Sequence, residues 1–429
     1  MTTLSAERKE PTILRRFLGV LGPGFVAGAS DDDPSGIGTY SQAGAQLGFS
    51  IGWTMLFTFP LMAAIQEISA RIGRTTGRGV LSKVCRHYPR WVLHPLVLLL
   101  CIANVINIGA DLSAMGEALK VLIGGPAILY VCLFAAFCVC AIVFLDYRRC
   151  AQVLKWSALS LFAYVAALFA THIPWGEAIT GILVPTITWN SDFLTTLVAI
   201  LGTTISPYLF VWQAAQEVEE LKHDAAAKPL KRAPWQAAVE FGRIRADTII
   251  GMAFSNVIAL AIILTTAAAL HANGTTDIQS SVQAAEALRP IAGDLAFALF
   301  ALGIIGTGLL AVPVLAGSTA YAVGEAYQWR VGLAHKPSKA VAFYGTLAGA
   351  TLLGVGITLT PIDPIKALYW SAVINGVVAV PVMILMMLIA SRRKIMGKFR
   401  LGGFVAVLGW VATAVMGLCV AGMAATIGS

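Results

Sequence analysis

Charged residues are scarce in this sequence. Asp, Glu, Lys and Arg together make up 12% of the 429 residues, whereas hydrophobic residues make up 58%. A soluble domain of this composition would expose large apolar areas to water. The composition therefore excludes a water-soluble globular protein and favours a protein embedded in lipid.

A secretory signal and a disulfide framework are also missing. The first 16 residues are polar and are not followed by a short apolar core with a small-residue cleavage site, so we expect the N-terminus to be retained. The seven cysteines show no paired extracellular pattern, and Cys138 and Cys140 fall on different helix faces. We therefore expect no metal or redox site at the cysteines.

Long apolar runs, by contrast, are abundant. Each of eleven runs is near or above the roughly 20 residues that a helix needs to cross the hydrocarbon core. They cover approximately residues 17–48, 51–71, 93–119, 126–146, 154–172, 193–216, 246–272, 292–327, 339–358, 366–391 and 403–425. The sequence predicts an all-α polytopic membrane protein with about eleven transmembrane helices, of which the first and sixth are interrupted.

Basic residues are concentrated in every second connection between the predicted spans. If the N-terminus is cytoplasmic, the cytoplasmic connections hold all of the 30 Lys and Arg residues except Lys120, Arg289 and Lys366. This asymmetry predicts a bacterial-type inner (plasma) membrane protein with a cytoplasmic N-terminus and an extracytoplasmic C-terminus. The net charge of +8 is then explained by contact with anionic lipid heads, without nucleic-acid binding.

Three acids interrupt the first apolar run. Asp31, Asp32 and Asp33 stand before Pro34, with apolar segments on both sides. Even a lenient insertion scale gives a cost of roughly 2.5–3.5 kcal/mol for a central Asp, so these acids must face a cavity, bind a cation or be protonated. Pro34 removes a backbone donor and Gly36 permits an unwound backbone, which leaves carbonyl groups free. Carboxylates beside free carbonyls suit a hard cation; the alternative is a helix end in water.

The sixth run has a second break. Gly202, Thr203, Ser206 and Pro207 lie in the middle of an apolar segment. Breaks five helices apart are typical of an inverted repeat, in which two discontinuous helices meet at the membrane midplane and form the substrate and ion sites. The predicted organisation is a cytoplasmic tail (1–16), a five-helix repeat (17–172), an extracytoplasmic loop (173–192), a second five-helix repeat (193–391) and a cytoplasmic loop with a final helix (392–429).

Other spans contain polar residues that lipid-facing helices avoid. Asn104, Asn107 and Asp111 share one face of the third span, Glu67 lies near the cytoplasmic end of the second, and Asn375 lies in the tenth. They could form a water or proton route, or hydrogen bonds between helices. We favour hydrogen bonds for the asparagines, and both interpretations stay open for Asp111.

Several motifs occur in order along the chain. They are GPGF, DPSG and QAGAQLG in the first span, QEISARIGRTTG in the second, ADLSAMG in the third and GTTISPY in the sixth. Over roughly residues 18–400 this set resembles the NRAMP family of divalent metal transporters. The resemblance implies a LeuT-type fold, with two inverted five-helix repeats and a final helix, and import of Mn²⁺ and Fe²⁺, usually with protons. The cation is the substrate, so no cofactor is expected.

The resemblance also implies metal ligands. Asp33 matches the aspartate of the family's Asp-Pro-Gly-Asn motif, and Ser30 and Thr203 occupy positions whose backbone carbonyls bind metal. Gly36 stands in place of the asparagine ligand, and Ser206 in place of the soft methionine ligand of a Met-Pro-His motif. Loss of sulfur predicts weaker discrimination against Mg²⁺ and Ca²⁺. In this respect the chain is similar to a divergent branch that includes magnesium transporters.

The implied proton route is altered. Asp111 matches a family acid linked to proton movement, but Asn104 and Ala114 stand where that path has Glu, and Tyr208 stands where it has His. These replacements argue against proton coupling, although Asp111, Glu67, Asn104 and Tyr208 remain candidates for a proton or water route. The resemblance thus predicts alternating-access transport of Mn²⁺/Fe²⁺ or Mg²⁺. Asp31 and Asp32 are candidates for an outer vestibule or a second ion site.

Two other functions are compatible with a helical membrane protein. An organic-solute or amino-acid carrier of the same architecture would bind a carboxylate at the helix breaks, but three acids would repel it. A Mg-dependent membrane enzyme would need a second acidic cluster within a span, and Glu217, Glu219 and Glu220 are interpreted as a solvated helix end. The 217–245 connection is predicted to be a flexible cytoplasmic loop. We therefore expect a transporter and not an enzyme, of undetermined oligomeric state.

Overall fold

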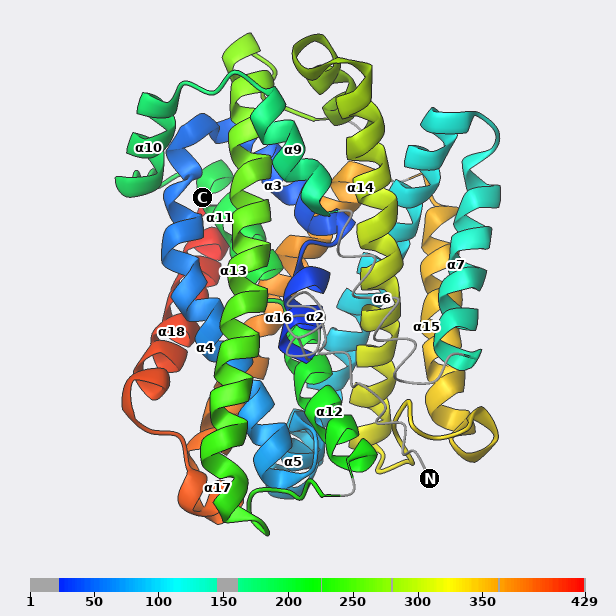
Figure 1. Cartoon of the computed structure of the whole chain (residues 1–429), viewed down its shortest axis with the longest axis vertical. Coiled ribbons are helices and arrows are strands. Elements are labelled where there is room, and N and C mark those ends of the chain that lie inside the picture. Colours follow the sequence, from blue (N-terminus) through cyan, green and yellow to red (C-terminus); the bar gives the residue numbers. More distant parts are fainter. Residues whose placement is uncertain (1–22, 145–160, 225, 279–280, 362, 428–429) are drawn as a thin grey trace, which may run out of the picture.

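The computed structural model describes residues 23–144, 161–224, 226–278, 281–361 and 363–427, and this part of the chain is helical and contains no β-strand. Most helices run along the long axis of the molecule (Figure 1). In chain order the α-helices are α2 (Pro23–Asp31), α3 (Pro34–Leu47), α4 (Trp53–Thr76), α5 (Val80–His87), α6 (Arg90–Ile123), α7 (Ala127–Phe144), α9 (Phe162–Ala170), α10 (Trp175–Leu183), α11 (Ser191–Thr204), α12 (Pro207–His223), α13 (Ala237–Ala269), α14 (Ser281–Ala326), α15 (Val341–Thr358), α16 (Pro364–Ser391), α17 (Arg393–Met396) and α18 (Gly403–Ile427). Short 3₁₀ turns lie at Gly48–Ile51, Pro234–Gln236, His271–Asn273, Pro337–Lys339 and Gly397–Phe399.

Every one of the eleven predicted spans overlaps at least one of these helices. Within the described residues, eight helical segments are long and apolar enough to cross a membrane, or nine if Pro34–Ile51 and Trp53–Thr76, which meet at 110°, count as one broken span. Eight is three fewer than eleven because the first span is divided into the short helices α2 and α3, α4 of the second span passes only together with Pro34–Ile51, and only α9 of the fifth span is described. The predicted tail and Arg148, Arg149 and Lys155 lie outside the described residues.

Both predicted helix breaks are present. Asp33 is the N-cap of α3, and its side chain accepts a hydrogen bond from the Gly36 N–H. This N–H lies in the first turn, so it has no carbonyl partner within the helix. Pro34 is the first residue of α3, and Pro207 is the first residue of α12. Proline thus starts the second half of each broken helix.

Glycine allows the broken helices to approach their neighbours closely. A Cβ on Gly28 of α2 would lie 2.8 Å from the Cα of Gly251 in α13. A Cβ on Gly202 of α11 would overlap the carbonyl oxygen of Ala372 and lie 2.8 Å from the Cα of Gly376, both in α16. Such contacts between small residues are typical of helix packing in membranes. They hold α2 against α13 and α11 against α16.

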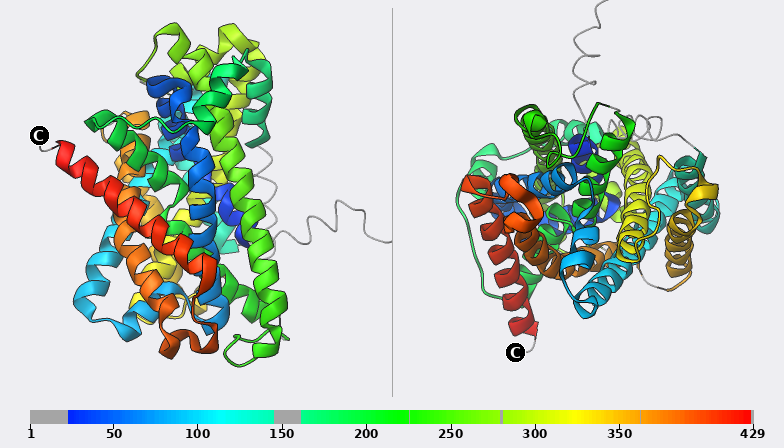
Figure 2. Two further views of the ribbon diagram at one scale, coloured as in Figure 1. Left: turned by 90° about the vertical axis from the view of Figure 1, so that its left-hand side faces the viewer. Right: turned by 90° about the horizontal axis from the view of Figure 1, so that it is seen from below.

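The described basic connections gather at one end of the bundle. Lys231 Nζ donates to the Ile395 carbonyl at 3.0 Å, and the Arg392 guanidinium carbon lies 4.9 Å from the centroid of the Tyr88 ring. Helices α5 and α17 lie at this end, whereas α10, from the predicted extracytoplasmic loop, lies at the opposite end (Figure 1). Helix α18 slants across one side of the bundle (Figure 2). The charge pattern of the sequence therefore corresponds to a real separation of the loops in space. We call the end of the bundle that carries α5 and α17 the basic end.

One prediction about these connections is wrong. The 217–245 connection was expected to be a flexible loop, but α12 continues to His223 and α13 begins at Ala237. Between them, the Leu230 and Lys231 N–H groups donate to the carbonyls of Arg74 and Thr75, each at 3.2 Å. Leu230 is fully buried. The buried Leu230 side chain and these two backbone hydrogen bonds attach the segment to the end of α4.

Candidate functional site

The Asp33 carboxylate lies at the first helix break, buried from solvent. Its Oδ1 accepts hydrogen bonds from the Ser35 hydroxyl and the Gly36 N–H, both at 2.7 Å. Its Oδ2 accepts from Asn107 Nδ2 of α6 at 2.8 Å and from the Tyr208 hydroxyl of α12 at 3.4 Å. Groups from three helices therefore converge on this one carboxylate.

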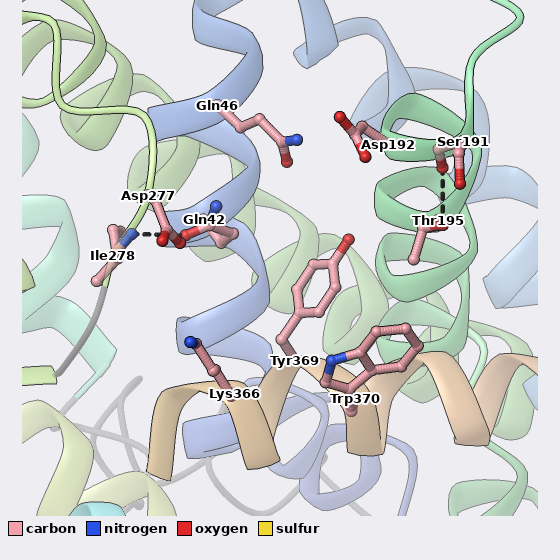
Figure 3. A pocket seen from close by; sticks show the side chains of 10 residues that line it. All are labelled: Gln42, Gln46, Ser191, Asp192, Thr195, Asp277, Ile278, Lys366, Tyr369 and Trp370. Atoms are coloured by element: carbon pink, nitrogen blue, oxygen red, sulfur yellow. Dashed lines mark hydrogen bonds between the residues drawn. The ribbon is translucent and has the colours of Figure 1, made fainter. Parts of the chain in front are cut away.

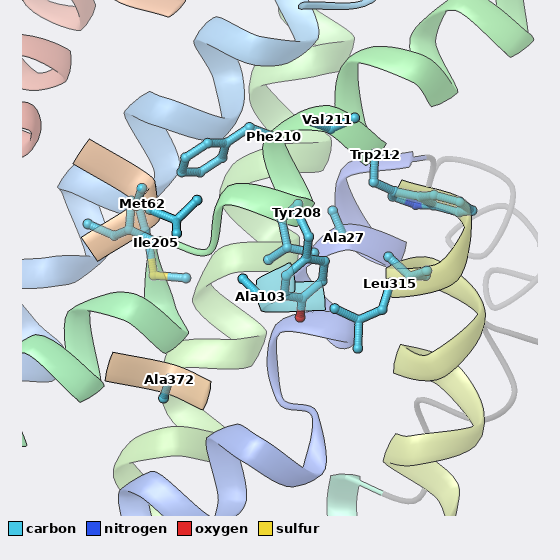
Figure 4. Close-up of a cluster of buried hydrophobic side chains, with 14 of the residues drawn as sticks. Ala27, Met62, Ala103, Ile205, Tyr208, Phe210, Val211, Trp212, Leu315 and Ala372 are labelled. Carbon is cyan, nitrogen blue, oxygen red and sulfur yellow. The ribbon is translucent and has the colours of Figure 1, made fainter. Parts of the chain in front are cut away.

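Tyr208 joins the two broken helices. Its hydroxyl lies 2.9 Å from the Ser30 carbonyl oxygen at the end of α2, while its own carbonyl accepts a hydrogen bond from Ser318 at 2.8 Å. Tyr208 is packed among buried side chains that include Ala103 and Leu315, with its hydroxyl directed toward the first break (Figure 4). The carbonyl of Ser30, one of the predicted ligands, thus faces the site.

The second break is in contact with the first. The Ser206 hydroxyl donates back to the carbonyls of Gly202, at 2.8 Å, and Thr203. A Cβ on Gly36 would lie 3.0 Å from the Thr203 methyl group and 3.2 Å from the Asp31 carbonyl oxygen. The absence of a side chain at Gly36 therefore lets the two breaks meet. Of the predicted ligands, the structure brings Asp33, Ser30, Gly36 and Thr203 together.

Asp31 and Asp32 face a different helix. Both are buried, and they share the Ser255 hydroxyl of α13, at 2.9 Å from Asp31 Oδ2 and 3.2 Å from Asp32 Oδ1. In the part of the chain that the structure describes, no three His, Cys, Asp or Glu side chains are grouped as metal ligands. The three consecutive acids therefore do not converge on one point, and Asp33 is the acid that meets the second break.

A cavity of about 380 Å³ opens at the end of the bundle opposite the basic end, between α3, α11 and α16 (Figure 3). It is lined by Gln42, Gln46, Ser191, Asp192, Thr195, Asp277, Ile278, Lys366, Tyr369 and Trp370. The Thr196 hydroxyl connects these three helices, at 3.0 Å from Gln46 Oε1 and 3.0 Å from the Tyr369 hydroxyl. Neither Asp31 nor Asp32 lines this cavity, although both were candidates for an outer vestibule.

The polar face of α6 divides into two kinds of contact. Asn104 Nδ2 donates to Thr319 Oγ1 of α14 at 2.9 Å, a hydrogen bond between helices. Asn107 contacts Asp33, and its own Oδ1 accepts from Ser371 of α16 at 2.6 Å.

The two acids named for the proton route have different surroundings. Asp111 is buried one turn beyond Asn107 and interacts electrostatically with Asp33. Glu67 forms ion pairs with Arg71 and Arg245 near the basic end. Asp111 therefore neighbours the site, and Glu67 belongs to an ion-pair cluster.

Sequence reasoning did not assign three residues of this polar network to the site, namely Asn107, Ser255 and Ser371. The spacing of Asn107 with Asn104 and Asp111 was a usable signal, but it did not separate the asparagine that contacts Asp33 from the one that does not. Ser255 and Ser371 lie in long apolar segments with nothing to distinguish them from other serines. Only packing brings Ser255 to Asp31 and Asp32, and Ser371 to Asn107.

A family model and several named relatives match most of this chain. A family model described as "Natural resistance-associated macrophage protein-like" matches residues 24–426. The "Divalent metal cation transporter MntH" of Klebsiella pneumoniae (strain 342) is 26% identical over 424 residues, covering 97% of this chain and 96% of that protein. The protein of the same name from Brucella suis biovar 1 (strain 1330) is 28% identical over 304 residues, covering 69% of this chain and 64% of that protein.

Solved structures confirm the predicted fold class. The manganese transporter of Eremococcus coleocola, in complex with an aromatic bis-isothiourea substituted compound, has a TM-score of 0.73 at 16% identity, with coverage of 97% of this chain and 88% of that chain. Mhp1, a nucleobase-cation-symport-1 family transporter in a closed conformation, has a TM-score of 0.55 at 13% identity, with coverage of 95% and 92%. The chain thus has the all-α, LeuT-type architecture of membrane transporters.

Proposed function

Because this chain belongs to the natural resistance-associated macrophage protein-like (Nramp) family, we propose that it is a multi-pass membrane transporter that carries divalent metal cations by alternating access. The MntH relatives are named divalent metal cation transporters. The structural observation that supports the proposal most directly is the buried Asp33 carboxylate where two broken helices meet. Asp31 and Asp32, close by in the chain, disfavour a carrier for carboxylate-bearing solutes.

We propose Asp33 as the main charged ligand of the cation. The carbonyls of Ser30 and Thr203 and the hydroxyl of Ser206 supply neutral oxygens, whereas Gly36 has no side chain to contribute. For the cation to reach Asp33 Oδ2, the donors on Asn107 and Tyr208 must turn away. Rotation of the Asn107 amide would then turn its oxygen, in place of its NH₂ group, toward the cation. The Asn107 oxygen would thus be a further neutral ligand.

The proposed ligands are all oxygens. Mg²⁺ is bound through one or two carboxylates and retained waters, whereas thioether sulfur selects softer metals. Our proposal is therefore that the site admits Mg²⁺ beside Mn²⁺ or Fe²⁺, with weak selection between them. We also propose that transport is not coupled to protons, because Asn104, Ala114 and Tyr208 stand where the family's proton route has Glu and His, and none of the three titrates near neutral pH. Asp111 then neighbours Asp33 without the rest of that route.

Uptake into proteoliposomes tests this proposal. The purified chain is reconstituted with metal-sensitive dyes inside, and entry of Mn²⁺, Mg²⁺ and Ca²⁺ is compared while internal pH is recorded. Asp33→Asn removes the charged ligand at nearly constant volume, and we expect at least about a tenfold loss of uptake, which corresponds to about 1.4 kcal/mol. Asp192→Asn, at the exposed acid of the outer cavity, is the matched control and should retain uptake within about twofold.

Three outcomes separate the parts of the proposal. Wild-type uptake by Asp33→Asn would remove Asp33 as the main ligand. Mn²⁺ entry with acidification, inhibited by Mg²⁺ only at large excess, would contradict both weak selection and the lack of proton coupling. Absence of Asp33-dependent flux for every ion would remove the transport function itself.

We further propose that the basic end faces the cytoplasm of a bacterial-type inner membrane. The expected orientation places α17 inside and α10 outside. Single cysteines at Arg393 and Gly176, introduced after the native cysteines are replaced, can be labelled in intact cells with a membrane-impermeant maleimide. We expect labelling of Gly176→Cys only, and the reverse pattern would invert the proposed topology.

A further inference from the structure

A separate cavity of about 350 Å³ lies at the basic end, between α5, the last turn of α12 and the segment that follows α14. Its lining consists of Gly77, Arg78, Gly79, Ser82, Arg86, Val218, Lys222, Glu325, Gln328, Trp329, Arg330, Val331 and His335. Three arginines and one lysine are accompanied by a single acid. The cavity is therefore strongly electropositive, and it contains none of the residues proposed to bind the transported cation.

The one acid is already used by the fold. Glu325 is buried, and its Oε2 accepts a hydrogen bond from the Ser82 N–H at 3.0 Å, in the first turn of α5. The carboxylate also lies directly against Gly79, where a Cβ would overlap it. A carboxylate at the N-terminus of a helix pairs with the unbonded N–H groups and the positive end of the helix dipole. Glu325 therefore stabilises α5, and it forms no ion pair with an arginine that the structure describes.

The arginines are available to a ligand. Lys222 pairs with Glu219 at 2.9 Å and also donates to the Val331 carbonyl at 3.2 Å. Arg78, Arg86 and Arg330 are exposed, and none of them forms an ion pair with a residue that the structure describes. Three guanidinium groups thus present unused donors around one cavity.

Exposed aromatic side chains mark the depth of the cavity in the bilayer. Trp329 lines it and stacks on Tyr327, with ring centroids 5.5 Å apart. Tyr327 in turn lies 5.7 Å from the ring of His94, near the start of α6, where Trp91 is also exposed. Trp and Tyr are enriched at the membrane–water interface. The cavity therefore lies near the depth of the lipid headgroups.

We propose that this cavity binds the phosphate group of an anionic ligand, which Arg78, Arg86 and Arg330 hold. Guanidinium groups pair with phosphate oxygens through two parallel hydrogen bonds. Basic pockets between membrane helices are known to receive anionic headgroups, and the interfacial depth makes a phospholipid of the adjacent leaflet one source of the phosphate. Free inorganic phosphate is the other source with the same chemistry.

The segment that carries Arg330 is attached to α12, the second half of the sixth span. The Glu219 Oε2 of α12 accepts from the Ala334 N–H at 3.2 Å, so the end of α12 is already attached to the segment that carries Arg330 and Val331. Lys222 adds a second contact, to the Val331 carbonyl. An anion held between Arg78, beside α5, and Arg330 would add a further connection across this end of the bundle. The bound anion would therefore restrain the Arg330 segment and, through Glu219 and Lys222, the end of α12.

Binding can be measured on the full chain purified in an uncharged detergent. Short-chain phosphatidylglycerol, short-chain phosphatidylcholine and inorganic phosphate are titrated separately, and the dissociation constant is obtained from the change in thermal stability. Arg78→Gln/Arg330→Gln removes two of the proposed contacts. Arg90→Gln/Arg393→Gln removes two exposed charges from the same end outside the cavity and serves as the matched control.

We expect saturable phosphatidylglycerol binding that weakens at least about tenfold in the cavity variant and stays within about twofold of wild type in the control, because charged hydrogen bonds are lost only in the former. Binding of inorganic phosphate with the same dependence identifies the free anion as a ligand, and its failure to bind identifies the lipid headgroup. Equal weakening in both variants, equal affinity for phosphatidylcholine, or no binding of any probe would overturn the proposal. Uptake by Asp33→Asn is independent of these outcomes.

Discussion

Asp33 illustrates how hydrogen bonds accommodate a buried carboxyl group inside a membrane protein. Its two oxygens accept hydrogen bonds from Ser35, Gly36, Asn107 and Tyr208, and all four donors are neutral groups. Neutral donors compensate a buried carboxylate only in part, whereas a divalent cation attracts it through a full electrostatic interaction. We therefore expect a divalent cation that reaches the site to displace these hydrogen bonds.

Ser206 is the residue at which metal selectivity can be tested. Its hydroxyl is bonded to the carbonyls of Gly202 and Thr203, so Ser206→Met both frees the Thr203 carbonyl and introduces a soft sulfur ligand. We expect Mg²⁺ to inhibit Mn²⁺ uptake only at a concentration at least about tenfold higher than in wild type. Ser206→Leu, of similar size but without sulfur, is the control. An identical shift in both variants would attribute the change to packing and not to the thioether.

At the scale of elements, small residues decide where the broken helices lie. Gly28 against Gly251 fixes α2 on α13, and Gly202 against Gly376 fixes α11 on α16. Asn107 adds hydrogen bonds that link Asp33 in the α2–α3 connection to α6 and Ser371 in α16. Close backbone contacts and a short polar chain thus position both helix breaks against α13, α6 and α16.

Gly202→Ala tests this contact. The added methyl group would overlap the Ala372 carbonyl oxygen, so α11 has to move away from α16. We expect a loss of about 1–3 kcal/mol of stability, by analogy with overpacked cores, together with reduced uptake. Gly349→Ala in α15 is the control, because no atom lies within 4 Å of the new Cβ. It should be neutral or stabilise the helix by up to about 1 kcal/mol. Comparable thermal stability of the two variants would contradict the proposed close contact.

At the scale of the whole molecule, a network of ion pairs closes the basic end. Arg243 of α13 pairs with Glu217 of α12 at 2.6 Å and with Glu240 at 3.1 Å, and Arg74 of α4 reaches Glu240 at 2.7 Å. Glu217 and Glu219 are fully buried, so their interpretation as a solvated helix end is wrong. The local charge pattern suggested exposure, but Arg243 pairs with Glu217 and Lys222 pairs with Glu219, which allows both acids to be buried.

Arg243→Gln should leave Glu217 buried without its charged partner. Breaking such a pair typically costs about 3–5 kcal/mol, so we expect a large decrease in the thermal unfolding temperature in detergent. The double variant Glu217→Gln/Arg243→Gln removes both charges and should recover most of the loss. If the double variant is as unstable as Arg243→Gln alone, the effect does not come from an unpaired charge.

The sequence by itself determined the membrane environment, the spans, the segregation of the basic loops and the positions of both helix breaks. These features follow from the transfer free energy of each segment and from the backbone chemistry of proline and glycine, which act locally. The ordered motifs also identified the family and pointed to Asp33.

Only the tertiary structure decided how the polar residues are divided among sites. In the folded protein, Asn107 and Tyr208 contact Asp33, whereas Asp31 and Asp32 face Ser255. Glu67 and Glu217 form ion pairs near the basic end. The contact between Ser371 and Asn107 joins residues 264 positions apart in the chain. Such a contact depends on how whole helices pack, and helix packing is set by the shapes of many side chains at once rather than by any local pattern.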